Sequence, residues 1–187
     1  MIVIRGWHIA LVVGVVGLLT LFYKGLWGNP KYIPPVLVGT PAPIFEGPEL
    51  YSGEPVSMNR FQGKVVMINF WASWCLECRY EHENLLAIHK RFGAHPNFVM
   101  LGIDYQDEES DAKKYLEVYG NTFTHIRDTQ GTISIDYGVY GVPETFVIDQ
   151  QGIIRFKQIG PIIGPAYTRL TDNILQPLLE GKPLPAL

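Results

Sequence analysis

Residues 65–78 read Val-Val-Met-Ile-Asn-Phe-Trp-Ala-Ser-Trp-Cys-Leu-Glu-Cys and contain the only two cysteines of the chain, Cys75 and Cys78. The apolar run at 65–71 predicts a buried strand. Helical spacing of apolar residues begins near Cys75 and continues to Phe92, so a helix is expected directly after the strand. Two cysteines separated by two residues at a strand-to-helix turn favour two-electron thiol–disulfide chemistry.

The spacing of the two cysteines has a physical meaning. Both thiols can meet within one helical turn, so a small disulfide ring closes and opens without refolding. Cys75 is expected at the N-terminus of the helix, where free backbone N–H groups and the positive end of the helix dipole stabilise a thiolate. The thiolate is the attacking species in disulfide exchange, so the pattern predicts a redox-active pair.

Two other interpretations of the cysteine pair stay open. A structural disulfide across so short a loop would remove little chain entropy, which makes it a poor stabiliser for a domain of this size. A metal site formed by Cys75, Cys78 and His82 is compatible with the helical spacing. It would need a distant fourth ligand, because the chain has no second cysteine pair.

The N-terminal part of the chain has a different composition. Between Trp7 and Tyr23 the only polar residues are His8 and Thr20. This stretch is near the lower length limit for a helix that crosses a bilayer. No small-x-small cleavage site follows it, so an uncleaved membrane anchor at residues 1–27 is favoured over a removed signal peptide.

Prolines gather directly after the expected anchor, in residues 28–43. They predict an extended tether, followed by a single domain at residues 44–187. With 187 residues, 47% of them hydrophobic, the chain can hold one well-cored domain beside these appendages. Basic residues are nearly balanced across the anchor, so the positive-inside rule does not decide its orientation. A redox domain on the periplasmic side of a bacterial inner membrane is the simplest expectation.

Charge argues against one class of partner. The net charge is −3 at pH 7, and every acidic residue lies after residue 31. A domain with an acidic excess is not expected to bind nucleic acid. The acidic residues at 104–111 are interpreted as a solvated loop and the start of a helix.

Strand and helix patterns alternate through the domain. The predicted strands are 65–71, 98–105, 124–127, 145–149 and 153–159, and the predicted helices are 75–92, 110–119 and 164–180, the last disturbed near its end by Pro177. A strand–helix–strand unit followed by a hairpin and a helix predicts an α/β fold. Its central mixed sheet would carry helices on both faces.

Two motifs give this pattern a family resemblance. Residues 75–82 read Cys-x-x-Cys-Arg-x-Glu-His, and residues 138–146 read Gly-Val-Tyr-Gly-Val-Pro-Glu-Thr-Phe. Together with the order of elements, they resemble the CcmG/DsbE thiol:disulfide interchange proteins of cytochrome c maturation. The resemblance covers roughly residues 37–180 and implies a thioredoxin-like fold, preceded by one N-terminal transmembrane helix.

The resemblance also implies roles for individual residues. Cys75 would be the exposed nucleophile that forms a mixed disulfide with the substrate, and Cys78 the more buried resolving thiol. Pro143 would be a cis-proline facing the disulfide, and the backbone at Val142 would pair with the bound peptide. From the residues alone, a Val-Pro pair before a strand is equally compatible with a trans turn, since cis bonds are rare.

Three further residues are assigned to the site in the same way. Glu81 and Glu144 resemble acidic residues that line the family's groove, and Trp74 is assigned to substrate contact. Glu81 follows Cys78 by about one helical turn, so its carboxylate could exchange a proton with the resolving thiol. From the residues alone, Glu81 is equally an ordinary solvated glutamate.

Two departures from related sequences bear on the direction of the reaction. Asn69 stands where thioredoxins proper carry a buried aspartate, and an amide cannot titrate, so Glu81 is the candidate base. The dipeptide between the cysteines is Leu76-Glu77 and lacks the proline found in many family members. The negative charge of Glu77 opposes thiolate formation at Cys75, which favours a reducing pair.

The resemblance thus implies an enzyme, a protein-disulfide reductase that acts on apocytochrome c. Its electrons would come from a membrane thiol reductase of the DsbD/CcdA type, and other cytochrome c maturation proteins and the inner membrane would be its partners. No cofactor beyond the Cys75–Cys78 pair is expected. The alternatives are a general extracytoplasmic disulfide reductase and a copper chaperone of the Sco type. The latter uses Cys-x-x-x-Cys, a spacing one residue longer than here.

Overall fold

The computed structural model describes residues 6–26 and 37–184, which fall into two separate units. The first unit is helix α1 (Gly6–Leu26). By length and composition its segment Gly6–Lys24 could cross a membrane. These are the properties expected of the anchor.

The second unit is a compact domain that begins at residue 37. Of the expected tether, residues 28–36 lie outside the described residues. Residues 37–43 are part of the domain: the Gly39 N–H donates to the Ile154 carbonyl (2.8 Å) and the Ile154 N–H to the Thr40 carbonyl (3.0 Å). This segment therefore lies against the first residues of strand β7.

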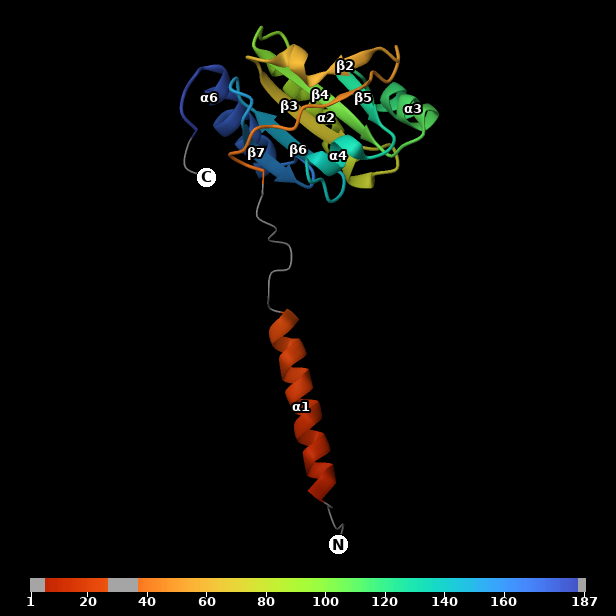
Figure 1. Cartoon of the computed structure of the whole chain (residues 1–187), viewed down its shortest axis with the longest axis vertical. Helices are drawn as coiled ribbons and strands as arrows, with labels where there is room; N and C mark the ends of the chain where they lie inside the picture. Colours follow the sequence, from red (N-terminus) through yellow and green to blue (C-terminus); the bar gives the residue numbers. More distant parts are fainter. Residues whose placement is uncertain (1–5, 27–36, 185–187) are drawn as a thin grey trace. The chain divides into compact units, whose positions relative to one another are not determined.

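A five-stranded mixed sheet forms the centre of the domain (Figure 1). Its strands are β3 (Val65–Trp71), β4 (Phe98–Tyr105), β5 (Thr124–Asp128), β6 (Glu144–Ile148) and β7 (Ile154–Ile159). They lie in the order β5-β4-β3-β6-β7; β3, β4 and β5 are parallel, and β6 and β7 run antiparallel to their neighbours. The expected mixed sheet and all five expected strands are confirmed, with ends shifted by at most one residue.

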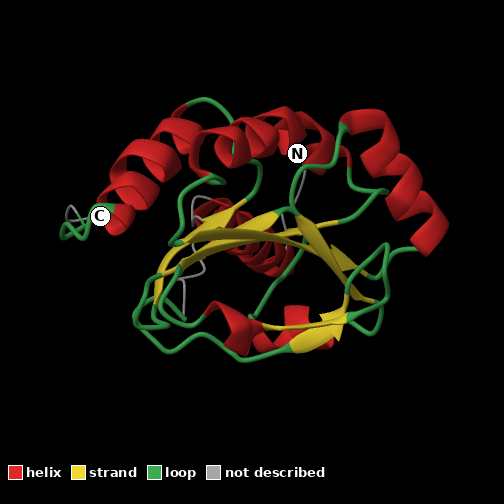
Figure 2. Cartoon of the chain, turned by 90° about the horizontal axis from the view of Figure 1, so that it is seen from above, coloured by secondary structure: helices red, strands yellow, loops and turns green. Residues whose placement is uncertain are grey.

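Helices cover both faces of this sheet, as expected (Figure 2). The longer helices share one face: α2 (Leu76–Phe92), α3 (Glu109–Tyr119) and the C-terminal run of α5 (Pro165–Thr168), η2 (Arg169–Leu175) and α6 (Gln176–Leu179). The other face carries smaller elements: the hairpin of β1 (Glu46–Pro48) and β2 (Pro55–Ser57), η1 (Met58–Phe61) and α4 (Thr132–Asp136). The fold is thioredoxin-like.

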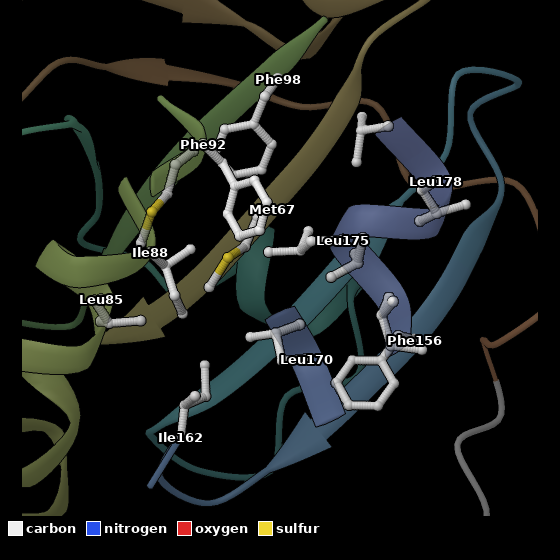
Figure 3. Packing of buried hydrophobic residues seen from close by; sticks show 14 of the residues in the cluster. Met67, Leu85, Ile88, Phe92, Phe98, Phe156, Ile162, Leu170, Leu175 and Leu178 are labelled. Atoms are coloured by element: carbon white, nitrogen blue, oxygen red, sulfur yellow. The ribbon is translucent and has the colours of Figure 1, made fainter. Parts of the chain in front are cut away.

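Strand β3 is buried along its whole length, because it is central in the sheet and covered on both faces. Met67 faces the longer helices and packs with Leu85 and Ile88 of α2 and with Leu170 and Leu175 of the C-terminal run (Figure 3). This packing fixes α2 above the sheet and therefore fixes where its N-terminus lies.

The small elements on the second face were not predicted from the sequence. The hairpin β1–β2 reaches the outer edge of the sheet, where the Leu50 N–H donates to the His125 carbonyl (2.8 Å). Strands of three residues and a helix of five give too short a periodic signal to recognise.

The C-terminal helix differs from the expected continuous helix. Residues 169–175 form a π-helical segment, in which the Gln176 N–H bonds the Thr171 carbonyl five residues earlier. Pro177 follows at the start of α6. Proline has no N–H and its ring collides with the carbonyl four residues before it, so the wider π-helical turn lets the chain continue. The disturbance expected at Pro177 is confirmed.

The side chains of His125 and Trp71 pack closely against Gly102 on β4, so a residue with a side chain does not fit at this position. A Cβ at this position would overlap the ring of His125 and lie 2.9 Å from Nε1 of Trp71. We expect Gly102→Ala to lower the free energy of unfolding by about 1–3 kcal/mol, the usual cost of overpacking. Urea unfolding followed by tryptophan fluorescence measures it. Gly141→Ala is the matched control, since its Cβ meets nothing within 4 Å; equal losses in both variants would contradict the prediction.

Candidate active site

The two cysteines form a disulfide at the start of α2, with their Cα atoms 5.3 Å apart. Cys75 is the N-cap of the helix, and the Cys78 N–H donates to its Sγ at 3.0 Å. The expected position at the helix N-terminus is confirmed. When the bond is reduced, this N–H and the helix dipole act on Sγ of Cys75 and favour its thiolate.

A cis peptide bond between Val142 and Pro143 lies opposite the disulfide. The carbonyl oxygen of Val142 is 3.5 Å from Sγ of Cys75. The cis bond expected at Pro143 is confirmed. Pairing of a bound peptide with the backbone of Val142 stays a prediction, and the position of that backbone beside the attacking sulfur is the one it requires.

Exposed apolar side chains border the buried sulfurs. The expected exposure of Cys75 is wrong for the disulfide form, because the residue is only 5% exposed, nearly as buried as Cys78. Its neighbours Trp74 and Leu76 are each 57% exposed. Tyr140, two residues before Val142, is also exposed. A partner that reaches the disulfide must therefore contact apolar surface first, which fits the role predicted for Trp74.

Glu81 is fully buried one turn after Cys78. Its Oε1 accepts a hydrogen bond from Nδ2 of Asn69 (2.8 Å), and its Oε2 accepts one from the Ile162 N–H (2.7 Å). The same amide group of Asn69 also donates to Oγ1 of Thr145 (3.0 Å). Asn69 therefore orients the carboxyl group of Glu81 instead of supplying a base of its own.

Burial raises the pKa of Glu81 to about 7, while the hydrogen bonds from Ile162 and Asn69 lower it in part. A carboxyl group that is half protonated near neutral pH can both give and take a proton. Its place on the helix that carries Cys78 suits the predicted proton exchange with the resolving thiol. The alternative of a solvated glutamate is wrong, because the side chain has no exposed surface.

The position of Glu144 differs from the expected groove. Glu144 pairs with Phe70 across β6 and β3, so its side chain lies on the sheet face opposite Glu81. It is 1% exposed, and its Oε2 forms an ion pair with Nζ of Lys157 at 2.8 Å. Its Oε1 accepts from the Tyr140 N–H (3.1 Å). Glu144 therefore supports the loop before Pro143 from beneath and offers no surface to a substrate.

Lys157 is a buried residue beneath the cis-proline loop that sequence reasoning missed. Its side chain is 5% exposed and lies over the rings of Tyr140 and Phe146, and its Nζ donates to the Gly138 carbonyl (3.0 Å). A lysine that alternates with apolar residues on a strand is ordinarily solvent-facing. Here the loop at 138–143 covers it, so the sequence pattern gave no signal.

His82 of α2 packs against α3 and the residue that follows it. Its Nε2 is 2.8 Å from the Gly120 carbonyl, and its ring packs edge-on against Tyr115. Tyr115 in turn donates its hydroxyl hydrogen to the Cys78 carbonyl (3.2 Å). In the described part of the chain, no three His, Cys, Asp or Glu side chains are grouped as metal ligands. The contact with Gly120 occupies Nε2, one of the two ring nitrogens of His82.

Fold and site together are those of a thioredoxin-like thiol:disulfide oxidoreductase. The AhpC/TSA family model matches residues 38–157. The chain is 36% identical to the thiol:disulfide interchange protein DsbE of Allochromatium vinosum over 168 residues, covering 89% of this chain and 91% of the relative. It is 35% identical to the protein of the same name from Pseudomonas aeruginosa over 161 residues, covering 81% and 87%.

A solved structure agrees with these relatives. The crystal structure of a thiol:disulfide interchange protein of the thioredoxin family from Chlorobium tepidum matches with a TM-score of 0.63 and 29% identity, covering 75% of this chain and 97% of that one. The chain belongs to the DsbE thiol:disulfide interchange proteins, within the AhpC/TSA family. Cys75 and Cys78 are its redox-active pair.

Glu81→Gln keeps a hydrogen-bonding oxygen but removes the titrating proton. We expect attack by Cys78 on a Cys75 mixed disulfide to slow by roughly 10² at pH 7, the usual contribution of a positioned acid or base. Stopped-flow release of the client thiol measures this step. Glu83→Gln, on the exposed side of the same helix, is the control; equal slowing in both variants would remove the role assigned to Glu81.

Glu81→Gln also tests the raised pKa of Glu81, through the pH dependence of the free energy of unfolding. Between about pH 4.5 and 7 the folded chain holds a proton on Glu81 that the unfolded chain has lost, so stability falls as pH rises. The contribution present at pH 4.5 and lost above pH 7 is on the order of 3 kcal/mol. Unfolding free energies measured from pH 4 to 8 should show a shallower decline in Glu81→Gln. A parallel decline in both proteins would contradict the prediction.

Lys157→Met leaves Glu144 buried without its cation. We expect the free energy of unfolding to fall by about 3–5 kcal/mol, because one member of a buried ion pair is then uncompensated. The double variant Lys157→Met/Glu144→Gln removes the orphaned charge and should recover most of the loss. Denaturant unfolding of both variants provides the comparison, and a double variant no more stable than the single one would refute the assignment.

Proposed function

We propose that this oxidoreductase is a membrane-anchored reductant of apocytochrome c, or of its mixed disulfide, during cytochrome c maturation. The observation that carries the proposal is the pair of motifs at 75–82 and 138–146, which the fold brings together at the disulfide. The apolar border beside Val142 supports an extended, cysteine-containing peptide as the substrate.

In the proposed reaction Cys75 attacks the client disulfide first and Cys78 acts second. The Cys75 thiolate attacks one sulfur of the client disulfide, the client S–S bond breaks, and a mixed disulfide forms. The Cys78 thiol, with its proton passed to Glu81, then attacks Sγ of Cys75. The client leaves as a dithiol, and two electrons have moved from Cys75 and Cys78 to it. The cysteine pair carries both electrons, so the exchange itself needs no further redox group.

The direction of the reaction is supported by one side chain beside the cysteines. Glu77 lies in the first turn of α2, where its negative charge opposes the formation of a thiolate nearby. This weakens the stabilisation of the reduced pair and so favours its oxidation at the expense of a client disulfide.

Helix α1 supports an anchored location. We place the domain on the periplasmic side of the inner membrane, where apocytochrome c is exposed to oxidants. There the Cys75–Cys78 disulfide would be reduced again by a membrane thiol reductase of the DsbD/CcdA type, and other cytochrome c maturation proteins would act on the same client.

Cys78→Ser stalls the reaction at the mixed disulfide and tests the client. We expect the reduced variant, expressed as the full chain, to capture apocytochrome c covalently, and the reduced wild-type chain to convert an oxidised Cys-x-x-Cys-His peptide to its dithiol. Non-reducing electrophoresis with mass spectrometry identifies the captured species.

Cys75→Ser/Cys78→Ser is the matched control and should capture nothing. Capture of unrelated periplasmic proteins in place of apocytochrome c would replace the proposal with that of a general disulfide reductase. Stoichiometric copper binding by the reduced chain, lost in His82→Ala, would favour a copper chaperone.

A further inference from the structure

One acidic residue near the end of β4 and one just after the strand are buried, although the sequence predicts a solvated loop at 104–111. Asp104 is 1% exposed and Asp107 is 9% exposed. Asp104 lies opposite Trp71 in the parallel register of β4 and β3. The loop that follows β4 therefore lies beside the turn that leads from Trp71 to Cys75.

Asp107 binds that turn directly. Its Oδ2 accepts from the Ser73 N–H (2.5 Å), and its Oδ1 accepts from the Ser73 hydroxyl (2.9 Å) and from the Glu108 N–H (2.9 Å). Ser73 is two residues before Cys75. Both oxygens of Asp107 are therefore committed to donors, and two of the three bonds hold the segment that carries the attacking cysteine.

The neighbouring residue strengthens the same connection. Nε1 of Trp74 donates to the Gln106 carbonyl (3.3 Å). Gln106 has a φ of 46°, a left-handed conformation that is uncommon for a residue with a side chain. Backbone of this kind persists only where the surroundings hold it, and here the contacts with Ser73 and Trp74 do so. From the other side, Nη2 of Arg79 donates to the Ser73 carbonyl (3.4 Å).

Asp104 has a different environment from Asp107. Neither of its carboxyl oxygens receives a hydrogen bond from an N–H or O–H group of the described residues. A buried carboxylate without a donor is costly, which favours the protonated form of Asp104. The negative charge of Asp107 favours the same form, and a protonated Asp104 can donate to a carboxylate. The proton belongs on Asp104, because both oxygens of Asp107 are already occupied by donors.

The other charged groups around Asp104 do not supply a partner that would replace its proton. Arg127 lies beside it in the register of β4 and β5, but its guanidinium pairs with Glu109 (3.0 Å) and donates to the Asp107 carbonyl (3.5 Å). Asp128 adds a second negative charge.

His125, which lies on β5 near Arg127, cannot supply a positive charge to Asp104. Burial lowers the pKa of His125 to about 3, so its ring is neutral. Burial, followed by repulsion from Asp107, raises the pKa of Asp104 to about 8, with Arg127 opposing the rise.

We propose that Asp104 and Asp107 form a carboxyl–carboxylate pair that shares one proton, and that this pair is a positioning element of the disulfide chemistry, holding the Ser73–Cys75 turn for attack. The proposal concerns the exchange reaction itself and does not depend on the identity of the client. Neither residue touches the sulfurs; both act through Ser73.

The pair should hold the Ser73–Cys75 turn more firmly at low pH than at high pH. Below about pH 8 the shared proton keeps the two carboxyl groups bonded and leaves Asp107 aligned with Ser73. As pH rises through this value, Asp104 becomes charged, the two carboxylates repel each other, and the turn is held less firmly. The added negative charge also opposes an incoming thiolate, so both effects slow exchange at Cys75.

The proton can be located in the oxidised full chain in detergent, in which no cysteine titrates. With 13C-labelled aspartate, we expect one carboxyl signal to titrate near pH 8 and to be absent in Asp104→Asn. The Ser73 amide signal should shift with the same midpoint. A signal for Asp104 that titrates below pH 5 would overturn the shared proton, and this measurement on the wild-type chain stands even where the variant fails to fold.

The positioning role is tested by the rate at which dithiothreitol reduces the Cys75–Cys78 disulfide. Asp104→Asn keeps a donor toward Asp107 and never ionises. We therefore expect the ratio of variant to wild-type rates to be constant below pH 7 and to rise severalfold between pH 8 and 9.5. Using a ratio cancels the ionisation of the reagent.

Glu108→Gln is the matched control, since it removes an exposed charge from the same loop. Its rate ratio should not change with pH across the same range. A flat ratio for Asp104→Asn, or an equal rise in Glu108→Gln, would show that the buried pair does not position the turn.

Discussion

The hydrogen-bonded register of β3 with its two neighbours is the constraint on which the active site depends. The antiparallel pairing of Phe70 with Glu144 brings the end of β3 beside the cis-proline loop, and so brings the Val142 carbonyl to the disulfide. The parallel pairing of Trp71 with Asp104 brings the loop after β4 to the other side of the same turn. A shift of either pairing by one residue would turn the side chains to the opposite face and separate these parts.

Three acidic residues around the active site are buried, and each has different partners that decide how its burial is tolerated. Glu81 has only neutral donors as partners, which do not fully offset the effect of burial, so its pKa rises to about 7 and it remains able to exchange a proton. Glu144 keeps its charge beside Lys157 and serves as a fixed support. Asp104 is buried without a donor, and burial together with the charge of Asp107 raises its pKa to about 8. The chemistry of each acid therefore follows from its partners more than from its distance to the sulfurs.

Much of this arrangement could be predicted from the sequence, because long periodic elements and the Cys-x-x-Cys motif are strong signals. The five sheet strands and α2 fall in this group, whereas the cis-proline was expected only from the family resemblance. The buried roles of Lys157 and Asp107 could not be recognised, since a charged residue in a strand or loop pattern is ordinarily solvated. A partial signal existed for Asp107: it follows the strand parallel to β3, and the carboxyl ends of parallel strands meet at one edge. Glu144 lies outside the groove in which it was expected, because a family motif gives proximity in sequence but not the side of the strand to which a residue points.

Both edge strands of the sheet are partly covered by segments that precede β3 in the chain. The backbone near Leu50 pairs with β5, and residues 39–42 pair with the turn and first residues of β7. An open edge with free N–H and carbonyl groups invites pairing with a neighbouring copy. The unpredicted hairpin and residues 39–42 leave fewer unpaired backbone groups through which two sheets could join.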